Sequence, residues 1–135
     1  MGQEKLGVVD EAAIRAVGLF GGGIGHTGNT CGALLGALAA LSMVYSRGNL
    51  EEKNNPARWQ VSGRLIRRFE ELTREHGGTH CLNIARVDWN DPQEVSQFRT
   101  GRKRICAGLV GDVAQALGEL LEQEVSGSSW GHDSQ

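Results

Sequence analysis

The sequence of 135 residues lacks a strong charge imbalance and has few aromatic residues. Fourteen Lys and Arg stand against sixteen Asp and Glu, for a formal net charge of −2 at pH 7. This balance provides no general attraction to nucleic acid or to an anionic membrane. The chain has three Phe, three Trp and one Tyr, and they are not interleaved with its basic residues to stack bases. We therefore expect neither nucleic acid nor a membrane as a partner.

Long apolar runs are also missing, and the N-terminus does not resemble a leader. Residues 31–45 are almost continuously apolar, but about 20 such residues are needed to cross a bilayer. The opening Met-Gly-Gln-Glu-Lys lacks a basic stretch followed by an apolar core. We expect a cytoplasmic protein with one helical domain over residues 1–125 and a loose tail over 126–135.

Cysteine is scarce, and its spacing matches none of the common cysteine motifs. The three cysteines are Cys31, Cys81 and Cys106, and no two of them form a Cys-x-x-Cys pair. The thioredoxin, rubredoxin and zinc-ribbon patterns are therefore not present. An odd number in a cytoplasmic chain argues against a disulfide framework. Metal binding, redox chemistry and burial as a small apolar residue remain open.

The apolar pattern predicts an all-α fold. We expect a compact bundle of about four to five helices around a central apolar helix rich in Gly and Ala, and no segment alternates as a strand. Short basic clusters at 64–68 and 99–104 are typical of solvated helix faces. The expected helical segments are 11–17 after the cap Asp10, 30–46, 55–76, a short turn after Thr79, a short helix after Asp91 that ends at Gly101, and 102–125.

A glycine-rich loop leads into the central helix. Five glycines between Gly21 and Gly28 allow positive φ angles and close approach of the backbone. Cys31 is expected in the first helical turn, where the helix dipole and unpaired N–H groups lower the pKa of a thiol. Cys31 is therefore predicted to be the most reactive thiolate.

All three cysteines are expected near the beginnings of helical segments. Such placement suits thiolates that act as ligands or nucleophiles, and we expect Cys31, Cys81 and Cys106 to converge on one site. His26 and His80 lie near two of them in sequence and can supply a further ligand or accept a proton. Loop or surface roles for both histidines are the simpler interpretation.

The glycine loop also permits a second kind of site. Glycines before a helix N-terminus can bind phosphate, which makes Gly22, Gly23 and Gly25 candidate cofactor-binding residues. The segment lacks the Gly-Lys-Ser/Thr ending of a P-loop, and no predicted strand precedes it. Phosphate binding is therefore the weaker interpretation.

The string Cys-Gly-Ala-Leu-Leu-Gly at 31–36 follows Phe-Gly-Gly-Gly at 20–23, and isolated cysteines follow at 81 and 106. This arrangement resembles the C-GCAxxG-C-C family of redox-active proteins, which is related to a domain of split-Soret cytochrome c. The resemblance covers roughly residues 10–122. It implies a small helical protein whose cysteines carry redox chemistry or bind an iron–sulfur cluster or another metal ion.

One departure from the family pattern concerns the number of cysteines. Family members usually have another cysteine before the glycine loop, whereas nothing before Cys31 is cysteine here. A cluster in this chain would need His26, His80, a small thiol, water or a second subunit to complete its ligands. Without the helix that usually carries this cysteine, we expect apolar surface to stay open, which favours a homodimer.

Two functions are therefore weighed. The leading hypothesis is a redox-active protein with an unidentified redox partner, in which Cys31, Cys81 and Cys106 bind metal or exchange disulfides. The alternative is a non-catalytic helical interaction module whose cysteines are buried structural residues. Whether the protein is an enzyme stays open at this point.

Overall fold

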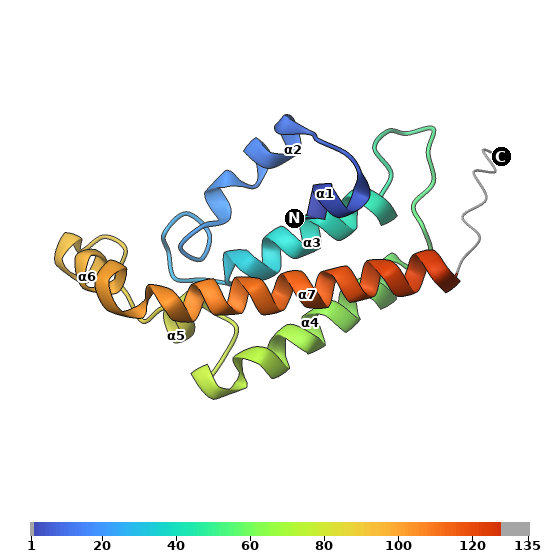
Figure 1. Ribbon diagram of the computed structural model, residues 1–135. Helices are drawn as coiled ribbons and strands as arrows, with labels where there is room; N and C mark the ends of the chain where they lie inside the picture. Colours follow the sequence, from blue (N-terminus) through green and yellow to red (C-terminus); the bar gives the residue numbers. More distant parts are fainter. Residues whose placement is uncertain (1, 128–135) are drawn as a thin grey trace.

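The computed structural model describes residues 2–127, and the regular structure in this range is helical, as predicted. In chain order the elements are α1 (Gly2–Leu6), α2 (Glu11–Ala16), the 3₁₀ turn η1 (Gly18–Phe20), α3 (Gly32–Tyr45), α4 (Arg58–Thr73), the 3₁₀ turn η2 (Arg74–His76), α5 (Cys81–Ile84), α6 (Pro92–Gln97), the π-helical turn η3 (Phe98–Arg102) and α7 (Lys103–Gly127) (Figure 1). The loose tail was expected from residue 126, but residues 126 and 127 belong to α7. Residues 128–135 lie outside the described range.

Three long helices, α3, α4 and α7, form the core, and each packs against the other two. In Figure 1, α7 runs the length of the molecule with α3 and α4 beside it. Buried residues on α4 and α7 recur every three to four positions, which places them on one face of each helix. The buried core residues of these three helices are Leu34, Ala37, Leu41, Tyr45, Val61, Leu65, Phe69, Leu109, Val113, Leu117 and Leu121.

A smaller apolar cluster lies beyond the main core, around α5 and the start of η3. Its buried members are Cys81, Ala85, Val87 and Phe98. Cys106 is half-buried and packs against both this cluster and the main core. The junction of the two clusters is therefore where α7 carries its cysteine.

Asp10 and Asp91 cap α2 and α6 as predicted, since their side chains accept hydrogen bonds from the first-turn amides. Gly101, in contrast, does not end a helix. It lies inside η3, which joins α6 to α7 without a non-helical residue, and the Lys103 N–H donates to the carbonyl of Phe98. A π-turn accommodates an extra residue within a helix, so the glycine bends the path and does not stop it.

An open apolar groove of about 830 Å³ lies between the N-terminal helices and α3. Val9, Ile14 and Phe20 line one side, and Gly36 and Ala39 line the other. Within residues 2–127, no helix is both long enough and apolar enough to cross a membrane. The homodimer expected from the sequence stays a prediction.

Candidate functional site

A short antiparallel bridge between Thr30 and His80 brings two of the cysteines together. The Cys31 N–H donates to the carbonyl of Thr79 at 3.0 Å, and the Cys81 N–H donates to the carbonyl of Asn29 at 2.7 Å. Cys31 and Cys81 each follow a bridge residue, so both side chains leave the same side of the pairing. Diagonal neighbours of this kind are separated by about 7–8 Å.

The glycine loop before Cys31 forms a left-handed turn. All five residues from Gly22 to His26 have positive φ angles, between 62° and 72°. The loop closes on itself, because the Gly25 N–H donates to the carbonyl of Leu19 at 2.7 Å and the Asn29 N–H donates to that of Gly23 at 2.9 Å. These two amides donate within the chain, so they are not available to a phosphate.

Gly23 is the point where this loop meets Cys81. A Cβ atom at Gly23 would lie 2.6 Å from the Cβ atom of Cys81 and 2.5 Å from the carbonyl oxygen of Asn29. Both distances are far below van der Waals contact, and the φ angle of +72° further disfavours a side chain. Gly23 therefore allows the loop to lie directly against the cysteine. Gly22 and Gly25 supply other left-handed positions of the same turn.

The three thiols influence one another electrostatically. All three cysteines are free; Cys81 is buried, whereas Cys31 and Cys106 are half-buried. Negative charge on Cys81 raises the pKa of both other thiols, and charge on Cys31 raises the pKa of Cys106. These effects link residues that are separated by 50 and 25 positions in the sequence.

Cys31 is the N-cap residue of α3, one position before the first turn. Its sulfur makes no capping hydrogen bond, but the amides of Ala33 and Leu34 face it and lower its pKa. Burial has the opposite and larger effect, and the charge of Cys81 adds to it, so the net pKa of Cys31 is raised. The helix terminus lowers this pKa as predicted, but desolvation outweighs the backbone donors and the net shift is upward.

Cys106 lies in the first turn of α7, as predicted. Burial is the largest effect that raises its pKa, followed by the charges on Cys31 and Cys81. The guanidinium of Arg102, four residues earlier on the same helical path, lowers this pKa. Arg102 is half-buried and donates from Nε to the carbonyl of Ala85 at 3.2 Å. The basic cluster was predicted to lie on a solvated helix face, but Arg102 is half-buried. The sequence signal for its role beside Cys106 is the four-residue spacing between the two, one helical turn.

Trp89 completes the surroundings of the thiols, although no sequence pattern marks it. Its indole Nε1–H donates to the sulfur of Cys81 at 3.3 Å. Its ring stacks on His26, with centroids 5.2 Å apart, and meets the edge of Phe98 at 5.1 Å. His26 thus contacts Trp89, which in turn donates to Cys81. His80 is exposed, and strand alternation directs its side chain away from the side that carries Cys31 and Cys81.

The donors expected to hold a metal ion or cluster are the three cysteines, with His26 and His80 as further ligands. Among residues 2–127, no three His, Cys, Asp or Glu side chains are arranged to hold a metal. His26 is stacked on Trp89, and His80 is exposed and directed away from the side that carries Cys31 and Cys81.

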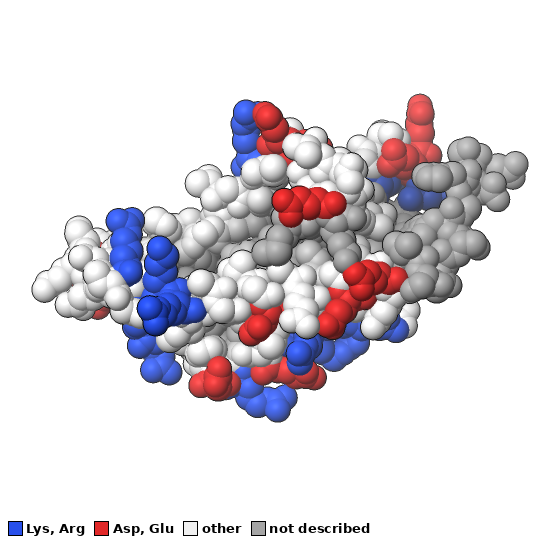
Figure 2. Space-filling view, in the orientation of Figure 1, with Lys and Arg blue, Asp and Glu red and all other residues white. Residues whose placement is uncertain are grey.

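Basic side chains surround the end of the molecule where α7 begins. Figure 2 shows Lys and Arg gathered on this end, and the local sequence supplies Arg99, Lys103 and Arg104 as exposed residues. These charges lie within about two helical turns of Cys106.

Comparison with known proteins gives one match. The family model described as "Putative redox-active protein (C_GCAxxG_C_C)" matches residues 1–120. No curated protein and no solved structure gives a significant match.

Proposed function

Since this chain belongs to the C_GCAxxG_C_C family of redox-active proteins, we propose that it transfers electrons by thiol–disulfide exchange at Cys31, Cys81 and Cys106. One observation carries the proposal: the Thr30–His80 bridge places Cys31 and Cys81 on the same side of one backbone pairing. Thiols on the same side of one pairing can form a disulfide after a movement of the backbone. A dithiol redox function needs two neighbouring thiols, whereas cysteines that only fill the core need no such neighbour.

The proposed reaction reduces a substrate disulfide. The thiolate of Cys31 attacks one substrate sulfur, forms a mixed disulfide and releases the other sulfur as a thiolate. The thiolate of Cys81 then attacks the sulfur of Cys31, which forms a Cys31–Cys81 disulfide and releases the second substrate thiolate. Two electrons pass from the protein to the substrate, and each protein thiol gives up its proton to solvent before attack.

The surroundings of each sulfur support these roles. Cys31 is more exposed than Cys81, so an incoming disulfide meets it first. The buried Cys81 accepts the N–H of Trp89, a donor that stabilises a thiolate. Cys106 is an accessory thiol whose charge depends on both others and on Arg102.

Closing the disulfide requires only a modest backbone movement. A disulfide needs Cα atoms about 4.4–6.8 Å apart, compared with the roughly 7–8 Å of diagonal neighbours. Glycines flank both halves of the bridge, the loop glycines before Cys31 and the pair Gly77 and Gly78 before Cys81. Their conformational freedom supports such a movement.

The two other uses of these thiols predict different results. A soft metal or iron–sulfur cluster would use the same sulfurs, but the described donors are not arranged for it. In the non-catalytic interaction module, the cysteines would only fill the core.

The test begins with protein purified without oxygen and treated with a neutral aromatic disulfide. Mass spectrometry without reductant should find a Cys31–Cys81 disulfide and two equivalents of released thiol. The C81A variant should stop at a mixed disulfide on Cys31, and the C31A variant should form neither this mixed disulfide nor the Cys31–Cys81 bond. The C106A variant should still form the Cys31–Cys81 disulfide. Three unreactive thiols in the folded protein would favour the interaction module. Stoichiometric metal that is lost in C31A would favour the metal site.

A further inference from the structure

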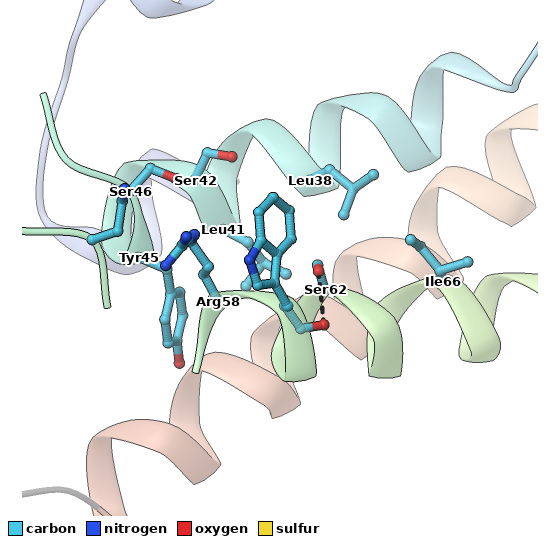
Figure 3. Close-up of a pocket in the computed structure, with 10 residues that line it drawn as sticks. Leu38, Leu41, Ser42, Tyr45, Ser46, Arg58, Ser62 and Ile66 are labelled. Atoms are coloured by element: carbon cyan, nitrogen blue, oxygen red, sulfur yellow. Dashed lines mark hydrogen bonds between the residues drawn. The ribbon is translucent and has the colours of Figure 1, made fainter. Parts of the chain in front are cut away.

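A second cavity lies far from the thiols, between the C-terminal half of α3 and the N-terminal half of α4 (Figure 3). Its volume is about 480 Å³, within the range of small-molecule sites. Tyr45, which lines it, is separated from Cys31 by the length of α3, about 20 Å. The lining residues are Leu38, Leu41, Ser42, Tyr45, Ser46, Asn54, Arg58, Trp59, Ser62 and Ile66.

The cavity has a polar end and an apolar end. In Figure 3, Arg58 extends toward the end where Ser42 and Ser46 lie, whereas Leu38 and Ile66 lie at the other end. A ligand that matches this lining carries its polar group at one end and an apolar body at the other.

Arg58 supplies the charge at the polar end, and it is the only charged residue among those that line the cavity. Its side chain is half-buried and donates from Nη1 to the carbonyl of Asn55 at 3.2 Å. Its guanidinium also lies 4.8 Å from the centre of the Trp59 ring. Among residues 2–127, no ion pair joins Arg58 to a carboxylate. A planar guanidinium with remaining N–H donors suits a carboxylate or sulfonate.

Trp59 forms part of the cavity wall while 72% of its surface is exposed. A side chain of this size in water leaves a large apolar ring available for contact. The hydroxyl of Ser62 donates to the Trp59 carbonyl at 3.0 Å, so the adjacent polar group is already used within α4. The exposed ring therefore favours a ligand with an apolar, preferably aromatic, body.

We propose that this cavity binds a small organic anion with an apolar body and a single carboxylate or sulfonate group. The anionic group pairs with Arg58, and the body extends toward Leu38 and Ile66 beside Trp59. One cation in the lining matches one negative charge on the ligand. The site is independent of the thiol chemistry, because its lining contains none of the three cysteines.

The test compares two fluorescent probes that share aromatic rings, anilinonaphthalene sulfonate and neutral phenylnaphthylamine. The sulfonate should bind the native protein, and R58Q should weaken its binding about tenfold or more, the effect of losing a charge-assisted hydrogen bond. Binding of the neutral probe should be weaker and should not change in R58Q. The control R67Q removes an exposed arginine nine residues later, on the opposite face of α4, and should bind the sulfonate as the native protein does.

A further variant addresses the cavity itself. S42F places a ring in the lining and should reduce binding of the sulfonate while circular dichroism shows native helix content. Equal sulfonate binding by native protein and R58Q would overturn the proposal. Undiminished binding by a folded S42F variant would also overturn it, because the probe would then occupy another surface.

Discussion

The indole N–H of Trp89 points at the sulfur of Cys81 across 3.3 Å, and the same ring stacks on His26 from the glycine loop. One side chain thus links the buried thiol to the segment that precedes Cys31. Trp89 lies between α5 and α6, so it contacts the thiol site from a segment separate from α3 and α7.

Replacing Trp89 with Phe should slow formation of the Cys31–Cys81 disulfide. The variant keeps an aromatic ring but loses the donor to Cys81, an interaction of about 1.5–3 kcal/mol with a charged acceptor. We expect the second step of exchange to slow by roughly tenfold or more in stopped-flow measurements. W130F, at a position outside the described residues, provides a matched control. An unchanged rate in W89F would argue against a role for this donor.

Replacing Gly23 with Ala should destabilise the fold strongly. The new Cβ atom would overlap Cys81 and Asn29, and the left-handed backbone adds about 1–2 kcal/mol. With about 1–3 kcal/mol for overpacking, we expect the free energy of unfolding in urea to fall by at least about 2 kcal/mol. G21A is the control, because Gly21 has a φ angle of −60° and no atom within 4 Å of an added Cβ. Similar stability of the two variants would contradict the packing described here.

The free energy of unfolding should fall as the pH rises above neutral. Burial raises the pKa of Cys31 and Cys106 in the folded state. The folded protein therefore holds their protons at a pH where the unfolded chain, with thiol pKa values of about 8.5, has lost them. The associated stability is complete below that pH and is lost as the pH rises through the folded pKa values. Urea titrations of reduced protein should show this loss, and the C31A/C106A double variant should show a shallower dependence. If the stability of the native protein and of the double variant depended equally on pH, groups other than Cys31 and Cys106 would cause the loss.

Replacing Arg102 with Gln should reduce the reactivity of Cys106. The guanidinium lowers the pKa of this thiol, so its removal raises the pKa further and decreases the thiolate fraction at neutral pH. Alkylation of Cys106, followed by mass spectrometry, should be slower in R102Q. The exposed neighbour Arg99 provides the control, and R99Q should retain most of the native rate. Faster alkylation in R102Q would show instead that the side chain mainly shields the sulfur.

Replacing Ile24 with Asn should stabilise the protein. Ile24 has a φ angle of 63°, and a β-branched residue in this conformation costs about 1–2 kcal/mol, whereas Asn adopts it more readily. The side chain is 46% exposed, so little core packing is lost. We expect a gain of about 1 kcal/mol in unfolding free energy. I24V keeps the β-branch and should show no gain.

Several local features could be predicted because their signals lie within a few residues. The apolar spacing predicts two long helices at 55–76 and 102–125, and the structure has α4 at Arg58–Thr73 and α7 at Lys103–Gly127. Asp10 and Asp91 precede their helices as good caps. The helix end predicted at Gly101 is wrong, because a glycine in the sequence does not distinguish the end of a helix from a π-turn within one. In the structure, Phe98 is the first residue of this turn and is buried in the smaller apolar cluster.

The sequence by itself determined the all-α class, the family, and a glycine loop that leads directly into Cys31. These properties depend on residue spacing and on local backbone preferences. Only the tertiary structure decided that Thr30 pairs with His80, that Trp89 reaches Cys81, and that burial raises the pKa of Cys31. Pairing across 50 residues leaves no periodic signal in the chain. The cost of charging a thiol depends on which atoms exclude water from it, and packing alone sets that cost.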